Sequence, residues 1–394
     1  MPDALPHAGR PLSADPERTV HWIGTGLSVG RSGLGLLCER AGRVFVWGRT
    51  RPKAAALLDR LGLTGRAEPH GLDDGDLPDL LAPGHTLVSM LPAAEHAALL
   101  RLAISRGAHF ACTSYATDEL RALAAEAGRS GLVVLAEAGL DPGIDHLLAH
   151  ELVSAARKAV GDSAGPVDLT SYCGGLPAVP NAFRYRFSWA PYGVLSALAQ
   201  PARYIEEGVV RTSQRPWEAT RTLRVGDEDF EAYPNRDSVP FTAQYVIPDG
   251  WRLRTFIRGT LRSSGWQEAW QPVFRTVETG DPDRIRALAR DLAQRYPATG
   301  EDRDRVVLAV SLTLAAERGG PGWRGECLLD VTGTAEESAM ALCVSLPLAH
   351  GVTRVLDGAL PAGLRCAAEG PEAALWLDFL RGHGIAAPLR EQSV

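Results

Sequence analysis

The sequence predicts an α/β protein in two parts: a doubly wound parallel sheet, followed by a second α+β domain with a mixed sheet and a short helical region. Three observations lead to this prediction. The first third of the chain alternates short apolar runs with runs of helical period. Those apolar runs are continuous, as in strands that are buried on both faces of a parallel sheet. From about residue 165 the pattern changes to strand-like runs broken by Gly, Pro and Asp.

The first part is expected to contain five strands with a helix after each. Strands are predicted at residues 19–23, 43–49, 85–91, 109–115 and 131–139. Helices are predicted to end at Arg40 and to span residues 51–61, 93–106, 117–129 and 143–158. Residues 1–18 are polar and rich in proline, which predicts a flexible tail and neither a signal peptide nor an anchor.

Composition excludes several classes of protein. The net charge of -6 is unfavourable for binding nucleic acid, and the absence of a run of about 18 apolar residues predicts no membrane span. Only Lys53 and Lys158 are lysines, so a lysine base has few candidates. The six cysteines form no CxxC pair, which favours reduced thiols in a cytoplasmic enzyme. His146 and His150 have a spacing compatible with a metal, but their apolar neighbours favour packed histidines, and no metal site is predicted.

A glycine-rich turn carries the first chemical signal. It follows the first predicted strand and precedes a helix, where free N–H groups and the helix dipole favour a pyrophosphate. The residues of this turn are Gly24, Gly26, Leu27, Ser28, Val29 and Gly30. The turn predicts a dinucleotide-binding, Rossmann-type domain over residues 19–145, although a glycine-rich turn without a ligand is the alternative.

The end of the second strand bears on which dinucleotide binds. An acid at this position would bind the ribose of NAD, but the chain has Arg49 and Thr50 there. A guanidinium and a hydroxyl suit a 2′-phosphate, so NADP is favoured over NAD. The alternative is that Arg49 is an ordinary surface arginine.

Polar residues also follow the later strands. Ligands of open α/β sheets bind beyond the carboxyl ends of the strands, which draws attention to residues 89–92, 113–115 and 140–142. Selection for turns alone would also place polar residues there.

The second part is expected to be a substrate domain over residues 146–334, with a short helical insert at about 267–303. Strand-like runs are predicted at VDLTSYCGG, RYRFSWA, TRTLRVGDEDFEAYP, QYVIPDGWRLRTFIRGTLR, residues 304–314 and GECLLDVTG. Arg258 and Arg262 would share one strand face with Thr260, a natural clamp for carboxylates or else a solvated face. Residues 335–394 are expected to supply return helices, at 336–357 and 372–383, that pack on the first domain.

Longer motifs in one order give a more specific signal. GLDPGIDHLLA, SYCGGLP, FSWAPYGVL, YPNRDS, IRGTLR, SAMALCVSLPLA and VLDGAL together resemble the saccharopine reductase family, the NADP-dependent, glutamate-forming saccharopine dehydrogenases. The resemblance covers residues 20–385. It implies oxidation of saccharopine to glutamate and aminoadipate semialdehyde, reversible as a reductive condensation, in lysine metabolism.

The resemblance also implies roles for single residues. NADP would contact the glycine turn, Arg49, Thr50, Leu91, Thr113, Ser114, Leu140, Asp141 and Pro142. The amino-acid substrate would contact Ser114, Tyr115, Asp141, Arg236, Thr260, Leu261 and Arg262. Asp141 and Tyr115 are the candidates for the catalytic base. A homodimer would be common in such a fold.

Some positions depart from the family pattern. The glycine turn has one extra residue, Val179-Pro180-Asn181 shorten a loop, and Ala190 and Tyr192 replace a usual serine and arginine. A reductase with a polyamine-type or simple amino-acid substrate, and a cofactor-binding protein without turnover, are therefore kept as alternatives.

Overall fold

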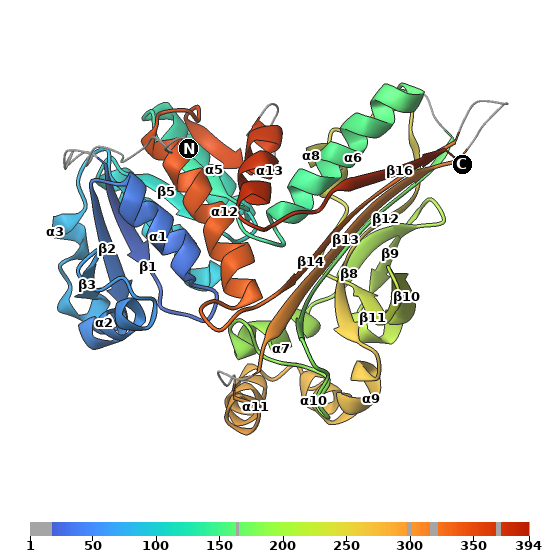
Figure 1. Ribbon diagram of the computed structural model, residues 1–394, viewed down its shortest axis with the longest axis horizontal. Coiled ribbons are helices and arrows are strands. Elements are labelled where there is room, and N and C mark those ends of the chain that lie inside the picture. The colour runs from blue at the N-terminus through green and yellow to red at the C-terminus, as the bar shows by residue number, and fades with distance from the viewer. Residues whose placement is uncertain (1–17, 163–164, 298–301, 316–321, 368–371, 394) are drawn as a thin grey trace, which may run out of the picture.

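The computed structural model describes residues 18–162, 165–297, 302–315, 322–367 and 372–393 (Figure 1). Almost all of the predicted N-terminal tail, residues 1–17, lies outside these ranges. The described chain forms two sheets, with helices on both faces of the first and along one side of the second.

The first sheet is parallel throughout and has the strand order of a doubly wound nucleotide-binding domain. In spatial order its strands are β15 (Gly363–Cys366), β6 (Val133–Ala136), β5 (His109–Cys112), β4 (Thr86–Ser89), β1 (Thr19–Ile23), β2 (Arg43–Gly48) and β3 (Glu68–Gly71). The direction of winding reverses between β1 and β4, so the carboxyl ends of these two strands border the crevice where such sheets bind ligands.

The helices that connect these strands are α1 (Arg31–Arg40), α2 (Arg51–Arg60), α3 (Leu77–Leu80), α4 (His96–Ser105) and α5 (Asp118–Arg129). The predicted alternation is confirmed for the five predicted strands and the helices between them, with most elements shorter than predicted. The sequence analysis did not predict α3, β3 or β15. The start of α5 shows why the chain turns helical there, because the Thr117 side chain accepts a hydrogen bond from the Leu120 amide.

The second sheet is mixed, as predicted. Its path runs β10 (Arg221–Val225), β11 (Glu228–Pro234), β12 (Arg252–Ser263), β7 (Pro166–Pro177), β13 (Asp304–Leu314), β14 (Trp323–Thr332) and β16 (Leu389–Ser393). The hairpin of β8 (Ala202–Glu206) and β9 (Val209–Ser213) pairs with β12. Within this path only the β12–β7 pair is parallel.

Two strand predictions in this domain are wrong. The run RYRFSWA, residues 184–190, forms no strand. Its residues Tyr185 and Phe187, together with Phe183 just before the run, pack their rings in an aromatic cluster with Trp270 instead. Most of QYVIPDG forms a turn after α8 (Phe241–Gln244), and β12 begins only at Arg252. The helical insert consists of α9 (Trp266–Ala269), α10 (Gln271–Val277) and α11 (Pro282–Arg295), and it packs on α7 (Pro191–Leu198).

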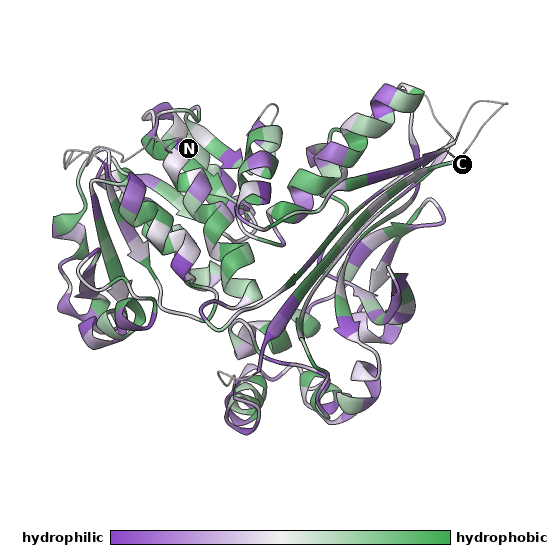
Figure 2. Ribbon diagram, viewed as in Figure 1, coloured by the Kyte–Doolittle hydropathy of each residue, from purple (hydrophilic) through white to green (hydrophobic). Residues whose placement is uncertain are grey.

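The C-terminal segment joins the two parts. Helix α12 (Ala339–Leu356) packs along α1, and α13 (Glu372–Gly382) contacts α6 (Ile144–Val160) and α12. The expectation of helices alone was incomplete, since β15 extends the first sheet and β16 the second. Helix α12 is long and apolar enough to cross a membrane, but 72% of it is buried against the rest of the protein (Figure 2).

Candidate functional site

A cavity of about 330 Å³ lies between the two sheets. The first domain contributes strand ends and the glycine turn, through Ser28, Thr113, Ser114, Tyr115, Leu140, Asp141 and Pro142. The second domain contributes Arg236, Thr260 and Arg262. Ten side chains predicted for cofactor or substrate therefore meet in one cavity, although they come from segments far apart in the sequence.

The glycine turn has the backbone that a close phosphate contact needs. Gly24 has a φ of 124°, and a Cβ there would lie 2.9 Å from the Met90 Cβ, so only glycine fits. A Cβ on Gly26 would meet nothing within 4 Å, which leaves open space above the turn. Leu27 is 45% exposed and Ser28 reaches the cavity. These features fit a dinucleotide at the turn.

Gly30 differs from the other glycines of the turn, because it contacts the C-terminal segment. Its N–H donates to Ser345 Oγ at 3.2 Å, and a Cβ on it would collide with the Glu337 carboxylate. The same carboxylate accepts a hydrogen bond from the Ser32 amide at 3.0 Å and another from the Ser32 hydroxyl. Gly30 therefore serves the packing of α1 on α12, and the sequence analysis missed Glu337 and Ser345.

Arg49 and Thr50 lie at the carboxyl end of β2, the position for which the sequence predicts contacts with a 2′-phosphate. Strand β2 ends at Gly48, next to β1, and Thr50 directly precedes α2. Arg49 is exposed and forms no ion pair with another described residue. Its guanidinium is therefore available to an anion at the carboxyl end of β2.

The two candidate bases are in direct contact. The Tyr115 hydroxyl donates to Asp141 Oδ1 at 2.7 Å and accepts from Arg258 Nη2 at 3.0 Å. Arg258 Nη2 also donates to Asp141 Oδ1 at 2.5 Å. Loss of solvation raises the pKa of Asp141 despite the attraction of Arg258, and burial raises the pKa of Tyr115 well above its ordinary value. Tyr115 therefore keeps its proton, and Asp141 is the group of this pair that can exchange one.

Arg258 is buried, with only 2% of its side chain exposed. Besides Asp141 it binds Asp145, whose side chain is fully buried at the start of α6. Its guanidinium stacks over the Phe241 ring at 4.2 Å. The predicted pairing of Arg258 with Arg262 as a substrate clamp is therefore wrong, because Asp141 and Asp145 already neutralise Arg258 from within the protein.

A second buried pair holds the loop that carries Tyr115. The Glu137 amide donates to the Ser114 carbonyl at 3.1 Å, and Glu137 Oε1 accepts from the Ala116 amide at 3.0 Å. His146 Nε2 lies 3.4 Å from Glu137 Oε2. Burial alone would raise the pKa of Glu137, but His146, the Ala116 amide and Gln244 lower it to about 2. Glu137 is thus a charged clamp, and the sequence analysis did not single it out.

Arg236 and Arg262 differ from Arg258, because neither forms an ion pair with a described carboxylate. Arg262 is 6% exposed and is surrounded by Tyr185, Tyr233 and Trp266, with its guanidinium carbon 4.9 to 5.6 Å from the ring centres. Its Nε has no hydrogen-bond partner. Arg236 is exposed and lies 5.5 Å over the Tyr115 ring. A buried donor without a partner at a cavity wall favours an anionic ligand.

Three predicted substrate or cofactor residues, Val29, Leu91 and Leu261, do not present their side chains to the cavity, and Val29 is buried in the core. Leu261 lies on the opposite face of β12 from Thr260 and Arg262 and packs in a buried cluster with Tyr172 and Ile257. The Leu91 side chain packs on the core beneath the first sheet. Alternation along a strand predicts the position of Leu261 directly.

Several cavity residues escaped prediction. Trp189, Val194 and Leu198 form an apolar wall, and Asn235 lies beside Arg236. Trp189 belongs to the run RYRFSWA, and the strand predicted there did not indicate that its ring would line a cavity.

His96 supports the cavity from behind. Its ring bridges the Ser89 hydroxyl at 3.1 Å and the Ser114 hydroxyl at 2.8 Å. Burial lowers the pKa of His96 to about 4, so the ring is neutral and orients Ser114 by hydrogen bonding.

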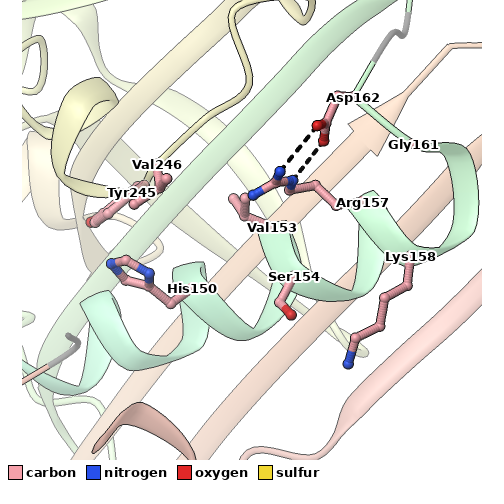
Figure 3. A pocket seen from close by; sticks show the side chains of 9 residues that line it. All are labelled: His150, Val153, Ser154, Arg157, Lys158, Gly161, Asp162, Tyr245 and Val246. Atoms are coloured by element: carbon pink, nitrogen blue, oxygen red, sulfur yellow. Dashed lines mark hydrogen bonds and ion pairs between the residues drawn. The ribbon is translucent and has the colours of Figure 1, made fainter. Parts of the chain in front are cut away.

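A second, more open depression of about 530 Å³ lies on the outer half of α6 (Figure 3). His150 and Tyr245 line it, and Arg157 is turned towards Asp162, which it binds at 2.7 Å. His146 does not point there, since its Nδ1 meets the Tyr245 hydroxyl at 2.9 Å inside the protein. Among the described residues, no group of His, Cys, Asp and Glu has the arrangement of a metal site.

Two models of protein-family domains match the sequence of this chain. Residues 20–135 match the saccharopine dehydrogenase NADP binding domain, and residues 139–385 match the saccharopine dehydrogenase C-terminal domain. The chain thus carries the NADP-binding domain of this family.

Curated relatives agree. The NADP⁺-dependent, L-glutamate-forming saccharopine dehydrogenase of Saccharomyces cerevisiae is 38% identical over 202 residues, which are 50% of this chain and 44% of that protein. The mitochondrial alpha-aminoadipic semialdehyde synthase of Bos taurus is 36% identical over 223 residues, 54% of this chain and 23% of that protein. The matched segment thus spans less than half of each of these two relatives.

Solved structures extend the likeness to the whole chain. Apo saccharopine dehydrogenase of Saccharomyces cerevisiae superimposes with a TM-score of 0.78 at 25% identity, covering 96% of this chain and 100% of that one. Homospermidine synthase of Legionella pneumophila, in complex with NAD, has a TM-score of 0.65 at 10% identity and covers 95% and 91%, which shows a shared fold only. With both of its domains matched by the family models, the chain belongs to the saccharopine dehydrogenase family.

Proposed function

We propose that the protein is an NADP-dependent oxidoreductase that acts on the C–N bond of saccharopine and forms L-glutamate and aminoadipate semialdehyde, reversibly, in lysine metabolism. The observation that carries this proposal is the pair of arginines without carboxylate partners, Arg236 and Arg262, beside the Tyr115–Asp141 pair in a cavity bordered by the glycine turn. Saccharopine carries three carboxylates, which suits two free guanidinium groups. The names of the relatives point to the same substrate.

The residues have separable roles in this proposal. Arg236 and Arg262 bind substrate carboxylates and fix the position of the reacting carbon. Gly24, Gly26 and Ser28 would hold the pyrophosphate of NADP, and Arg49 with Thr50 its 2′-phosphate. When bound, NADP supplies the acceptor for a hydride.

Asp141 acts on the substrate nitrogen. It accepts the proton of the secondary ammonium group, so that the nitrogen lone pair can form the imine double bond as the hydride leaves carbon. Water then adds to the imine carbon, and the C–N bond breaks to give the amine of glutamate and the aldehyde. Tyr115 keeps its proton and holds Asp141 in place by hydrogen bonding.

The test is to incubate the purified protein with saccharopine and NADP⁺, follow absorbance at the wavelength of NADPH and identify the products by mass spectrometry. We expect glutamate and the semialdehyde in equal amounts. NADPH formation without glutamate would refute the assignment of the cleaved bond, and no NADPH formation would refute saccharopine as the substrate. The homodimer and the cytoplasmic location expected from the sequence stay predictions.

A further inference from the structure

Asp145 and Arg258 form a buried ion pair directly behind the cavity. Asp145 does not line the cavity, and its side chain is fully buried. Its Oδ1 accepts the Gly143 amide at 2.7 Å, and its Oδ2 accepts from Nε and Nη2 of Arg258. The guanidinium therefore faces two carboxylates at once, Asp141 on the cavity side and Asp145 on the protein side.

The charges of this group do not balance. One guanidinium stands between two carboxylates, so the cluster carries an excess negative charge when both acids are ionised. Removing such a charge from water is costly, and the cost falls when one acid takes up a proton. Asp145 accepts three hydrogen bonds and lies away from the cavity, whereas Asp141 accepts two and lines the cavity with 14% of its side chain exposed. Asp141 is therefore the acid that exchanges the proton.

We propose that Arg258 is a positioning residue that divides its charge between Asp141 and Asp145, so that Asp145, outside the cavity, sets how readily Asp141 takes up a proton. Arg258 acts through geometry as well as charge. It donates to the Tyr115 hydroxyl, stacks on Phe241 and thereby fixes the direction from which Tyr115 and Asp141 face the substrate. This inference rests on the proposed role of Asp141 as proton acceptor.

Other charged or titratable groups also face Asp141 and contribute to its pKa. Tyr115 and Arg258 contact Asp141 directly. Burial raises the pKa of Asp141, and His146, whose Nδ1 lies 3.5 Å from Asp145 Oδ2, opposes part of this rise together with Arg258. Cys173 and Tyr245 are near enough for Asp141 to raise their pKa values, in addition to the larger effect of burial. Neither residue ionises near neutral pH, so the balance depends on Arg258, Asp145 and His146.

Two substitutions with opposite expected effects test the proposal. In Asp145→Asn, Arg258 has Asp141 as its one anionic partner of this cluster, so the acidic limb of the kcat/KM profile for saccharopine shifts to lower pH. In Arg258→Gln, Asp141 loses its cation, and the limb shifts to higher pH. We expect about one pH unit in each direction. Shifts in the same direction, or no shift in either variant, would overturn the proposal.

Matched controls come from the same sheet, with Arg254 on β12 and Asp168 on β7. Arg254 pairs with Asp168 through Nε and Oδ1 at 2.9 Å, and Arg254 is exposed. Arg254→Gln and Asp168→Asn remove the same chemical groups from the same sheet and should leave the limb in place. If Arg258→Gln yields no folded protein, Arg258→Lys keeps the charge without the fork, and an upward shift smaller than one unit is then expected. A Lys variant with an unmoved or lowered limb would also contradict the proposal.

A second readout separates this inference from the proposed function. Aspartate labelled with ¹³C at the side-chain carboxyl reports the titration of Asp141 by NMR without any substrate, and Asp141→Asn assigns its signal. If saccharopine is not turned over but Asp145→Asn still lowers the titration midpoint of Asp141, the proposed function fails and the inference stands. If saccharopine is turned over and that midpoint does not move, the inference fails alone.

Discussion

Three arginines of the second domain differ in whether a carboxylate of the protein pairs with them, and this difference separates their roles in the site. Arg258 is neutralised by Asp141 and Asp145, whereas Arg236 and Arg262 have no described carboxylate partner. The sequence alone places Arg258 and Arg262 on one strand face but does not reveal which of them is already paired. That distinction depends on the start of α6, which is more than one hundred residues earlier in the chain.

The role of Arg236 can be tested by its removal. Arg236→Ala should raise KM for saccharopine roughly ten- to a hundredfold, because one charge-assisted contact to a carboxylate is lost. NADPH affinity, measured by fluorescence titration, should stay unchanged, since Arg236 belongs to the second domain.

Arg203 provides the control for Arg236. Its amide donates a hydrogen bond to the Arg236 carbonyl, and its side chain pairs with Asp237. Arg203→Ala therefore perturbs the same turn without removing an arginine that lacks a carboxylate partner. A rise in KM of equal size in Arg203→Ala would show that the turn, rather than the charge of Arg236, matters. Loss of NADPH binding in Arg236→Ala would show that the residue contacts the cofactor.

Arg49 is expected to select the cofactor. Arg49→Ala should lower the affinity for NADPH roughly ten- to a hundredfold while the affinity for NADH changes little, because only NADPH carries the 2′-phosphate. Arg60, exposed at the far end of α2, is the control and should have no effect when replaced by alanine. Equal loss of NADPH and NADH affinity in Arg49→Ala would contradict the assignment.

At the scale of elements, the sequence predicts the first sheet well because its strands are continuous apolar runs between helices. The strands that it misses are short and lack this pattern. Strand β3 reads EPHG and β15 reads GLRC, and both find their places by pairing with a strand that is already buried. The false strand at RYRFSWA arises from alternating aromatic residues, whose alternation serves an aromatic cluster instead of a sheet.

The packing of α1 on α12 makes a prediction at this scale. A Cβ on Gly33 would lie 2.5 Å from the Ser345 carbonyl oxygen, whereas a Cβ on Gly35 would meet nothing within 4 Å. Gly33→Ala should therefore lower the free energy of unfolding by about 1–3 kcal/mol through overpacking. Gly35→Ala should raise it by about 0.5–1 kcal/mol, because alanine favours the helix more than glycine does.

Chemical denaturation measures both variants. Opposite signs are expected from two substitutions that are identical in chemistry and lie in the same helix. If Gly33→Ala were also stabilising, α1 and α12 would not be in the close contact described here.

At the scale of the whole molecule, the site exists only where the two domains meet. The first domain brings Asp141, Tyr115 and the glycine turn, and the second brings Arg236 and Arg262. The sequence predicts both sets, from strand ends in the first domain and from the family resemblance in the second. It does not predict the contacts made by Glu137, Asp145 and Arg258, because these depend on how the second sheet is seated against α6.

The C-terminal segment explains how the two domains are held together. After α12 packs on α1, the chain adds β15 to the first sheet and β16 to the second. The glycine turn and the two cavity arginines, Arg236 and Arg262, are therefore built on one continuous framework.

The measurement that tests this account most directly compares three substrates in the NADP⁺ reduction assay: saccharopine, an N-linked amino acid that lacks one of its carboxylates, and a polyamine. Because two free arginines face the cavity, kcat/KM should be highest for saccharopine, should fall when one carboxylate is missing and should be lowest for the polyamine. A preference for the polyamine, or equal values for all three substrates, would contradict the claim that Arg236 and Arg262 select a polycarboxylate substrate.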